Sequence, residues 1–200
     1  MPFSTAAWPA HRARSAWRPC VPELPTLAGD PLLLRPIGDQ DQPLYVALYG
    51  DGETMGRAMP ALDTTEAMRA FARERQAPRS GMRRMTWILA DKHAGAGFGL
   101  LGLVLDEARG AEVGVLLPPA HQGQGHATQA IALVARYAFE TLDLHRLYTR
   151  HAEGHAAASG LMRRLGFKPA PAGAPPHPIR WTLTRETWQA ARRDKAGPFS

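Results

Sequence analysis

Residues 111–140 read AEVGVLLPPAHQGQGHATQAIALVARYAFE, and the rest of the chain can be placed around them. Residues 112–117 are typical of a buried strand, which the proline pair at 118–119 ends because proline has no N–H for a sheet ladder. From Thr128 onward, apolar side chains recur at helical spacing. A loop of bare backbone N–H groups that leads into a helix binds phosphate well. The stretch therefore predicts a phosphate or pyrophosphate ligand at residues 122–128.

Composition places the chain among soluble globular proteins. Its 200 residues are 44% hydrophobic and 21% charged, which suits one domain with a core of its own. The formal net charge is +6, but the basic residues are scattered, so we expect a solvated surface and no nucleic-acid partner. Such a surface still favours an anionic ligand. The single Cys20 excludes an internal disulfide framework and a cysteine-based metal site; we expect no metal and a cytoplasmic location.

The two ends of the chain are expected to lie outside the domain. Residues 1–29 are basic and rich in proline; their start resembles a transit peptide in composition, but without a clear amphipathic helix or an apolar signal core. We expect a disordered basic tail there, a domain at 30–190 and a frayed tail at 191–200. The longest apolar run, residues 94–105, is too short and too rich in glycine to span a bilayer, so no membrane partner is expected.

The remaining patterns predict a mixed sheet with helices on both faces, an α/β fold. Antiparallel strands come first, and a strand–helix–strand–helix–strand unit follows. Strands are expected at residues 31–36, 85–90, 96–105, 146–150 and 180–184, and helices at 44–49, from 64, from 128, at 155–165 and from 186. Asp63 and Glu66 have the spacing of a capping box at the start of the second helix.

Three glycines, Gly95, Gly97 and Gly99, share one parity in the expected strand at 96–105 and leave one face without side chains. Two interpretations are open. A helix packs closely against the bare face, or the face leaves room for a ligand.

Several motifs occur in a fixed order along the chain. Gln122, Gly125 and Ala127 form the pattern Gln, two residues, Gly, one residue, Ala. Around it stand EVGV at 112–115, ATQAI at 127–131, LHRL at 144–147 and LGF at 165–167. This ordered set resembles the acetyl-CoA-binding core of the GNAT acetyltransferase superfamily. Residues 34–36 and 50–55 resemble the branch that acetylates ribosomal-protein N-termini and many small amines, and the resemblance covers roughly residues 30–190.

The resemblance implies how acetyl-CoA binds. The central strand and its neighbour would splay apart to admit the pantetheine arm, with the proline pair at 118–119 marking the start of the splay. Backbone groups of the strand end would pair with the arm, and amides of the following loop would hold the pyrophosphate. The implied residues are Val115, Leu116 and Leu117 for the arm, and Gln122, Gly123, Gln124, Gly125, His126, Ala127 and Thr128 for the pyrophosphate.

The resemblance also implies the reaction, a direct attack of a primary amine on the acetyl thioester. The acceptor would be a small-molecule amine or a protein N-terminus, and a homodimer is an open expectation for the assembly. The chemistry needs a base for the amine, a donor for the developing oxyanion and a proton for the leaving thiolate. By resemblance, the oxyanion donor is a backbone N–H near Leu116 or Leu117. The acceptor would contact residues 45–71 and 169–178.

The proton-moving residues are less clear, because the chain departs from the family pattern. Glu112 would be the base if it faces the acceptor; otherwise it is a carboxylate in solvent. The family's usual Asn and Ser positions hold His155 and Ala158, with Ser159 one place later, and its usual Tyr position holds Met162. His155 can replace the Asn as a contact to the cofactor or as the proton donor. Ser159 would need a change of helix face of roughly 100°, and water is the remaining donor.

Two other functions compete with an active acetyltransferase. A GNAT-like module that binds acyl-CoA without turning it over is favoured by the missing Asn, Ser and Tyr. A dinucleotide-binding site at Gly123 and Gly125 is disfavoured, because a Rossmann glycine turn follows its strand directly, whereas residues 118–122 intervene here. His126, inside the loop, is expected to be a surface or phosphate neighbour and not a base.

Overall fold

A computed structural model describes residues 24–56, 59–76, 84–151, 154–170 and 179–193. These residues form one sheet of eight strands in the order β1-β2-β3-β4-β5-β6-β8-β7. All neighbouring pairs are antiparallel except β5 and β6, which are parallel. The strands are β1 (Leu27–Ala28), β2 (Leu32–Pro36), β3 (Arg84–Asp91), β4 (Gly97–Leu105), β5 (Gly110–Leu116), β6 (Arg146–His151), β7 (Lys168–Pro169) and β8 (Ile179–Thr184). The predicted mixed α/β sheet is confirmed.

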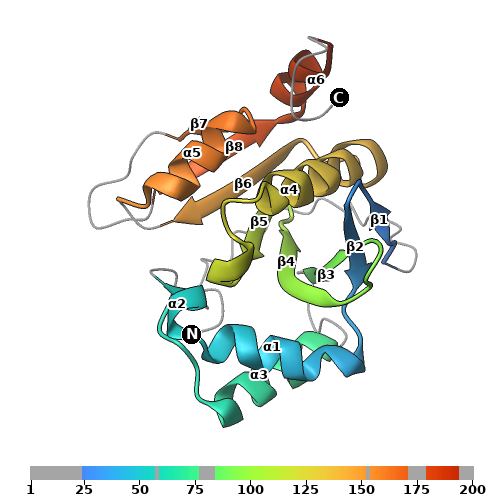
Figure 1. The fold of residues 1–200 in the computed structure, drawn as a ribbon. Coiled ribbons are helices and arrows are strands. Elements are labelled where there is room, and N and C mark those ends of the chain that lie inside the picture. The colour runs from blue at the N-terminus through green and yellow to red at the C-terminus, as the bar shows by residue number, and fades with distance from the viewer. Residues whose placement is uncertain (1–23, 57–58, 77–83, 152–153, 171–178, 194–200) are drawn as a thin grey trace.

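Helices cover both faces of the sheet, as Figure 1 shows. One face carries α1 (Gln42–Gly50), α2 (Gly52–Met55) and α3 (Thr64–Arg75), preceded by the short η1 (Asp39–Asp41). The other carries α4 (His126–Arg136), which continues as the π-helix η3 (Tyr137–Thr141), together with α5 (Ala156–Arg164) and α6 (Arg185–Arg193). A further short helix, η2 (Pro119–His121), follows β5.

Local sequence signals set several of these boundaries. The predicted capping box is present: Asp63 accepts from the Glu66 amide, and the Glu66 carboxylate accepts from the Asp63 amide. Asp51 accepts from the amide of Thr54 and so begins α2 directly after α1. The last helix extends to Arg193, three residues past the expected domain end at 190. The rest of the expected frayed tail, residues 194–200, lies outside the described residues.

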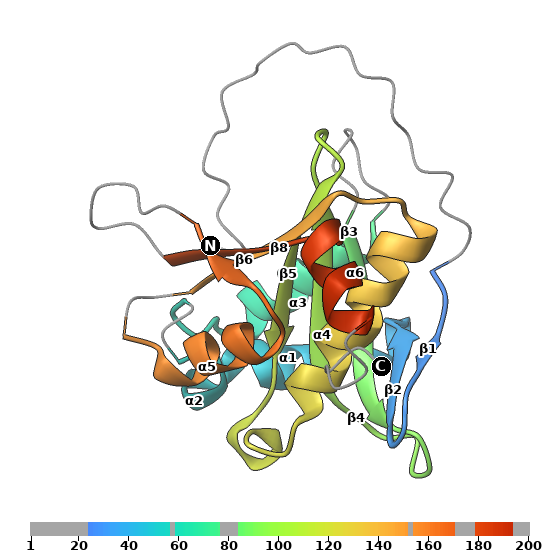
Figure 2. The same cartoon turned by 90° about the horizontal axis from the view of Figure 1, so that it is seen from above.

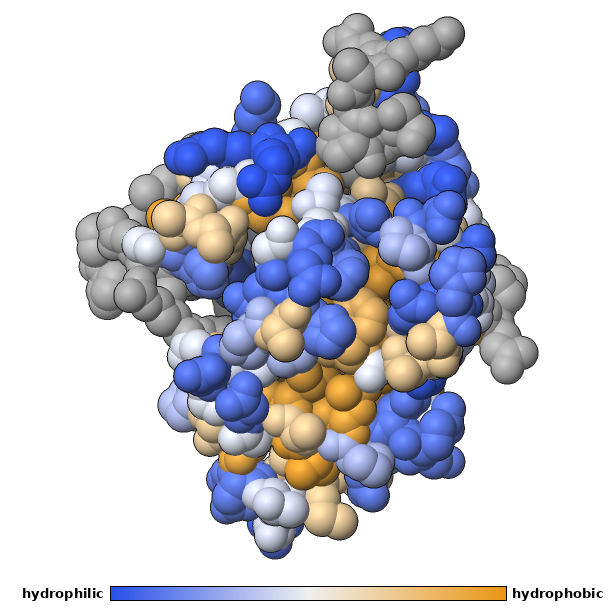
Figure 3. Space-filling view, viewed as in Figure 1, coloured by the Kyte–Doolittle hydropathy of each residue, from blue (hydrophilic) through white to orange (hydrophobic). Residues whose placement is uncertain are grey.

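The two faces of the sheet have separate apolar cores. On the α4 face, Val113 of β5 and Leu147 of β6 pack with Val134 of α4 and Met162 of α5. On the opposite face, side chains of α1 and α3 pack on Ile88 and Leu100, with Leu116 at the edge. In Figure 3, apolar side chains reach the surface over β4, between α4 and α1. Each face of the sheet thus has its own core. Because side chains alternate along a strand, the position of a residue in its strand determines which core its side chain joins.

The expected bare face of β4 does not form, because a register shift between Leu89 and Ala90 puts Gly97 and Gly99 on opposite faces of the sheet. A Cβ on Gly97 would lie 2.5 Å from a methyl group of Ile88 and 3.1 Å from Leu44 of α1. A Cβ on Gly99 would lie 2.6 Å from the Leu117 side chain and 2.9 Å from the Leu116 carbonyl oxygen. Close helix packing is therefore confirmed at Gly97, whereas Gly99 packs against the end of β5 and not against a helix. Neither glycine leaves space for a ligand.

The N-terminal tail ends earlier than the sequence predicts. Leu27 and Ala28 form β1 and pair with β2, and the Trp87 indole N–H donates to the Pro25 carbonyl at 2.8 Å. This short strand covers the edge of β2, which local patterns in residues 1–29 do not reveal because the pairing is tertiary. Residues 1–23 of the expected tail lie outside the described residues.

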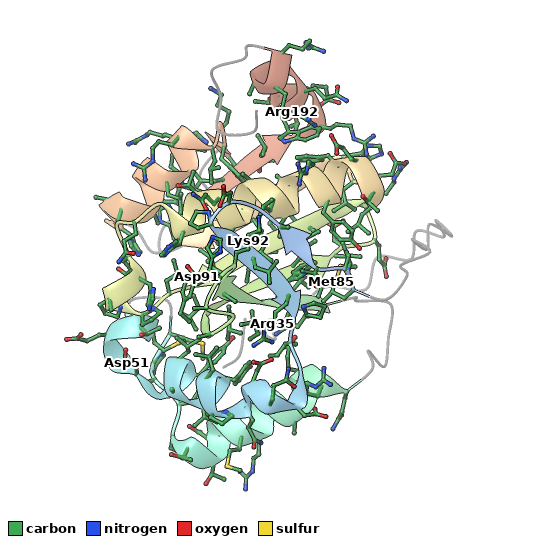
Figure 4. The ribbon with its side chains drawn as sticks, turned by 45° about the vertical axis from the view of Figure 1, so that its right-hand side comes forward. Arg35, Asp51, Met85, Asp91, Lys92 and Arg192 are labelled. Carbon is green, nitrogen blue, oxygen red and sulfur yellow. The ribbon has the colours of Figure 1, made fainter. Side chains whose placement is uncertain are left out.

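A buried ion pair ties the first helix to the sheet. The Arg35 guanidinium, on β2, donates to both carboxylate oxygens of Asp41 at 2.7 and 2.8 Å. The Gly38 amide donates to the same carboxylate at 2.8 Å. Figure 4 shows Arg35 between β2 and α1. Asp41 is 4% exposed, so its charge depends on these partners.

Candidate active site

The site begins where two adjacent strands part. β5 and β6 pair only over Gly110–Arg146, Ala111–Leu147 and Glu112–Tyr148. Both strands continue, β5 against β4 as far as Leu116 and β6 against β8 as far as His151. Figure 2 shows β6 and β8 running away from β5. The backbone groups of residues 113–116 that point away from β4 are thus left out of the sheet ladder.

The position of this splay corrects the sequence expectation. The proline pair at 118–119 was expected to mark its start, but the ladder already ends at Glu112, six residues before Pro118. The prolines instead lead into the turn of η2 (Pro119–His121), where Pro118 is extended. The divergence comes from β6, which follows β8, and not from missing N–H groups on β5.

The loop after β5 presents backbone amides at the start of α4. Gly123 and Gly125 have φ of 73° and 83°, the left-handed region that glycine adopts without steric cost. The helix begins at His126, two residues before the predicted Thr128, and its first helical bond here joins the Gln129 amide to the Gly125 carbonyl. The amides of His126, Ala127 and Thr128 therefore precede the helical ladder. This is the geometry of an anion site at a helix N-terminus.

The side chain of Gln122 closes the loop onto the strand. Its Nε2 donates to the Leu117 carbonyl at 2.8 Å, and the next glutamine, Gln124, donates to the Ala120 carbonyl at 2.6 Å. Both side chains therefore shape the loop from within. The Leu117 carbonyl, one of the strand-end groups expected to bind the cofactor arm, accepts from Gln122 and keeps a second lone pair. Its pairing with the arm stays a prediction.

Aromatic rings support the same loop from the side of β4. The His121 ring stacks on Phe98 with centroids 4.3 Å apart, and the His126 ring lies 4.8 Å from Phe98. His126 Nδ1 donates to the His121 carbonyl at 3.3 Å. These contacts hold the first residue of α4 against β4, which fits the expected place of His126 beside the loop.

The Glu112 side chain lies on the same face of the sheet as α1 and α3. Ala111 and Val113 belong to the α4-side core, so the alternating Glu112 points to the opposite face. Its carboxylate accepts from Arg150 Nε at 3.1 Å and from Arg150 Nη2 at 2.6 Å. Glu112 is therefore not the isolated solvent carboxylate that the sequence left as an alternative. Each oxygen retains a second lone pair for another donor.

A different group of polar residues lies on the α4 face. His151 is the last residue of β6, and its side chain points to the same face of the sheet as that of Leu147. Its Nε2 lies 3.4 Å from Ser159 Oγ. Ser159 thus points toward the sheet without any rotation of α5. His155 caps α5, because its Nδ1 accepts from the Ala158 amide at 3.4 Å, and its ring centroid lies 5.9 Å from that of His151. Glu112 and the pair Ser159–His155 are thus on opposite faces of the splay.

Two residues of this arrangement were missed from the sequence. Strand alternation places His151 on the same face as Leu147, so parity was a usable signal once the strand was extended by one residue. Arg150 had no such signal. Its contact with Glu112 depends on the parallel register of β5 and β6, which residues 38 positions apart do not reveal locally.

Within residues 24–56, 59–76, 84–151, 154–170 and 179–193, the side chains form neither a metal cluster nor a membrane span. No three His, Cys, Asp or Glu side chains in these ranges lie together as metal ligands would. None of the helices in the described part of the chain is both long and apolar enough to cross a bilayer.

The splayed strand pair, the amide loop and the helix that follows are the features by which this fold can be compared with known proteins. The family model for the acetyltransferase (GNAT) domain matches residues 31–168, and the chain belongs to this family. It is therefore an acyltransferase. The uncharacterized N-acetyltransferase YoaA of Bacillus subtilis is 26% identical over 147 residues, 72% of this chain and 83% of YoaA.

Other relatives include enzymes named for a polyamine. Spermidine N(1)-acetyltransferase of Escherichia coli K12 is 37% identical over 59 residues, which cover 30% of this chain and 32% of that enzyme. Spermidine N-acetyltransferase from Vibrio cholerae, solved with CoA and spermine, matches with a TM-score of 0.69 at 19% identity, over 80% of this chain and 99% of that one. A GNAT-family acetyltransferase from Bacillus anthracis matches with the same TM-score at 15% identity, over the same shares. The structural matches establish the fold.

Proposed function

We propose that the protein transfers an acetyl group from acetyl-CoA to a primary amine by direct attack. The observation that carries the proposal is the early end of the β5–β6 ladder at Glu112 and Tyr148, followed by a loop of bare amides. Strand backbone left outside the ladder can pair with an amide-containing arm. The helix start can hold a pyrophosphate, so one extended ligand fits both features.

The residues that fit acetyl-CoA follow from this geometry. The backbone of Val115 and Leu116 would bind the arm, and the amides of residues 122–128 would hold the pyrophosphate. When bound, acetyl-CoA supplies the acetyl group as a thioester. The backbone N–H near Leu116 or Leu117 would donate to the thioester carbonyl oxygen as negative charge develops there.

The two faces of the splay divide the proton transfers. On the acceptor side, a free lone pair of Glu112 accepts a proton from the amine, directly or through water, while Arg150 fixes the carboxylate. The amine nitrogen then forms the amide bond as the carbon–sulfur bond breaks. On the α4 side, Ser159 donates a proton to the leaving sulfur and His151 orients or replenishes that hydroxyl. His155 contributes as a contact to the cofactor arm or as a second donor.

A small-molecule amine is the acceptor that we place first, because relatives carry the name of spermidine acetyltransferase. A protein N-terminus is the second, supported by the residues that resemble the ribosomal-protein branch. Part of the expected acceptor region, residues 171–178, lies outside the described residues. A cytoplasmic location and a homodimer stay predictions.

The test uses the full chain, isotope-labelled acetyl-CoA, small amines and N-terminal peptides. We expect amine-dependent release of free CoA with label in the amide product. Separate titration with CoA should show saturable binding. Turnover with every amine no faster than thioester hydrolysis would contradict the proposal.

A second candidate function is an acyl-CoA-binding regulatory module. The observation in its favour is that Met162 and Ala158 occupy the positions where relatives carry Tyr and Ser. Saturable binding of acetyl-CoA without transfer to any amine would support the module. Amine-dependent CoA release that disappears in Glu112→Gln would reject it.

A further inference from the structure

The acceptor side of the splay carries a positive charge that the proposed chemistry does not use. Arg150 and Arg180 are directly opposite each other in the β6–β8 register, so both side chains lie on the same face. The Arg180 guanidinium lies 4.1 Å from the centroid of the Tyr148 ring. Tyr148 is the register partner of Glu112. Arg180, on β8, is therefore one strand away from Tyr148 of β6 and two strands away from Glu112 of β5.

Among the described residues, the two carboxylates that act on Tyr148 each have an arginine partner. Glu112 pairs with Arg150 at 2.6 Å, and Asp106 pairs with Arg146 at 3.2 Å. Within the described ranges, the Arg180 guanidinium pairs with no carboxylate and donates no hydrogen bond. It lies over the Tyr148 ring as a cation–π contact. Three arginines thus face two carboxylates around Tyr148, and Arg180 is the cation in excess.

The electrostatic environment of Tyr148 reports the same grouping. Burial raises the pKa of its phenol, the charges of Asp106 and Glu112 raise it further, and those of Arg180 and Arg150 act to lower it. All five groups are thus close enough to interact. The Arg180 guanidinium has a full set of donors, and its Nε is buried without a partner in the structure. An anion at this point would satisfy donors that are otherwise unused.

From this charge balance we infer that the acceptor is a small amine that also carries an anionic group, such as a carboxylate, which Arg180 binds. The inference rests on the proposed function. β5 and β8 are two strand spacings apart at Tyr148, so the anionic group lies within roughly 10 Å of the amine that Glu112 deprotonates. A polyamine would bring further positive charge toward Arg180 and would find no unpaired carboxylate on β5, β6 and β8.

The experiment compares acceptors that differ only at the far end. Aminohexanoate, hexylamine and diaminohexane have the same carbon chain with an anionic, neutral and cationic end. We expect kcat/KM for aminohexanoate to exceed that for diaminohexane at least tenfold, with the difference shrinking as salt is added. An amino acid and a peptide with an acidic second residue are run in parallel to separate a small-molecule acceptor from a protein N-terminus.

Variants connect this preference to Arg180. Arg180→Gln should raise KM for aminohexanoate about tenfold and leave that for hexylamine and the Kd for CoA unchanged, whereas Arg180→Lys should keep most of the preference. The matched control is Arg163→Gln, because Arg163 lies 5.7 Å from the Trp181 ring on the opposite face of the sheet. It should leave the ratio between the acceptors unchanged.

The outcomes separate the inference from the function on which it rests. Faster turnover of diaminohexane or spermidine would overturn the inference and leave the acetyltransferase proposal intact. An unaltered preference in Arg180→Gln would also overturn it. Preferred turnover of the acidic peptide over every small acceptor would reject the small-molecule part of the inference. CoA binding without turnover of any amine would reject the proposed function itself.

Discussion

Glu112 and Arg150 join β5 to β6 through a bidentate ion pair at the end of the ladder between these strands. Two side chains thus connect the strands where backbone pairing stops. The pair fixes a carboxylate on the face of the splay where we propose that the acceptor binds, and the side chains are partly exposed, 22% for Glu112 and 42% for Arg150. Its role is therefore better tested through catalysis than through stability, since exposed ion pairs contribute little to folding.

Removing the Glu112 carboxylate should lower kcat by about two to four orders of magnitude, the usual contribution of a positioned base. Glu112→Gln is the variant, with acetyl transfer and CoA binding measured side by side. Arg150→Gln should reduce kcat less, because the carboxylate remains and loses only its orientation. An unchanged kcat in Glu112→Gln would exclude the residue as the base.

The proton donor on the α4 face should depend on Ser159 and His151 together. Ser159→Ala and His151→Gln are each expected to lower kcat about tenfold or more, and the double variant should lower it little further, because the two act as one unit. Additive losses would show that the two residues do not cooperate, and unchanged rates would leave water as the donor.

The conformation of Gly125 should control cofactor affinity. Gly125→Ala places a Cβ at φ of 83°, which costs roughly 1–2 kcal/mol and disturbs the amides of the loop. We expect the Kd for CoA to rise about tenfold, measured by calorimetry. Gly95→Ala is the matched control, since its φ is 70° and nothing lies within 4 Å of its added Cβ, as at Gly125. It should be strained to a similar degree without weakening CoA binding.

The glycine at position 99 should be essential for packing. Gly99→Ala places a Cβ 2.9 Å from the backbone oxygen of Leu116, which cannot move aside as a side chain can. We expect a loss of about 1–3 kcal/mol of unfolding free energy, as for overpacked cores. Gly102→Ala, on the same strand with nothing within 4 Å, should cost less in a denaturant titration. Equal losses in both would contradict this explanation.

The Arg35–Asp41 pair should make stability depend on pH. Burial acts to raise the pKa of Asp41, but the hydrogen bonds from Arg35 and the Gly38 amide outweigh it, so the pKa is lowered. A carboxyl group with a lowered pKa adds stability above its unfolded pKa of about 3.9 and loses it as the pH falls through the folded value.

Asp41→Asn should therefore cost about 2 kcal/mol near neutral pH, as expected for hydrogen bonds to a charged group. The difference from the wild type should shrink in denaturant titrations below about pH 4. A difference that stays constant across this range would show that the charge of Asp41 is not the cause.

The sequence by itself determined the order of the main elements and the glycine loop before α4, because these depend on neighbours along the chain. The capping box at Asp63, the turn at 91–95 and the glycines before α4 act within a few residues. Pattern periodicity likewise placed the core strands to within a residue or two.

Only the tertiary structure decided where the splay begins, which residue holds Glu112 and which histidine meets Ser159. Each depends on the register and divergence of strands that are distant in sequence, as the 38-residue separation of Glu112 and Arg150 shows. Gly97 and Gly99 make the same point, since their neighbours Ile88 and Leu117 come from other strands and loops. Local patterns encode which way a side chain points; packing between segments decides what it meets.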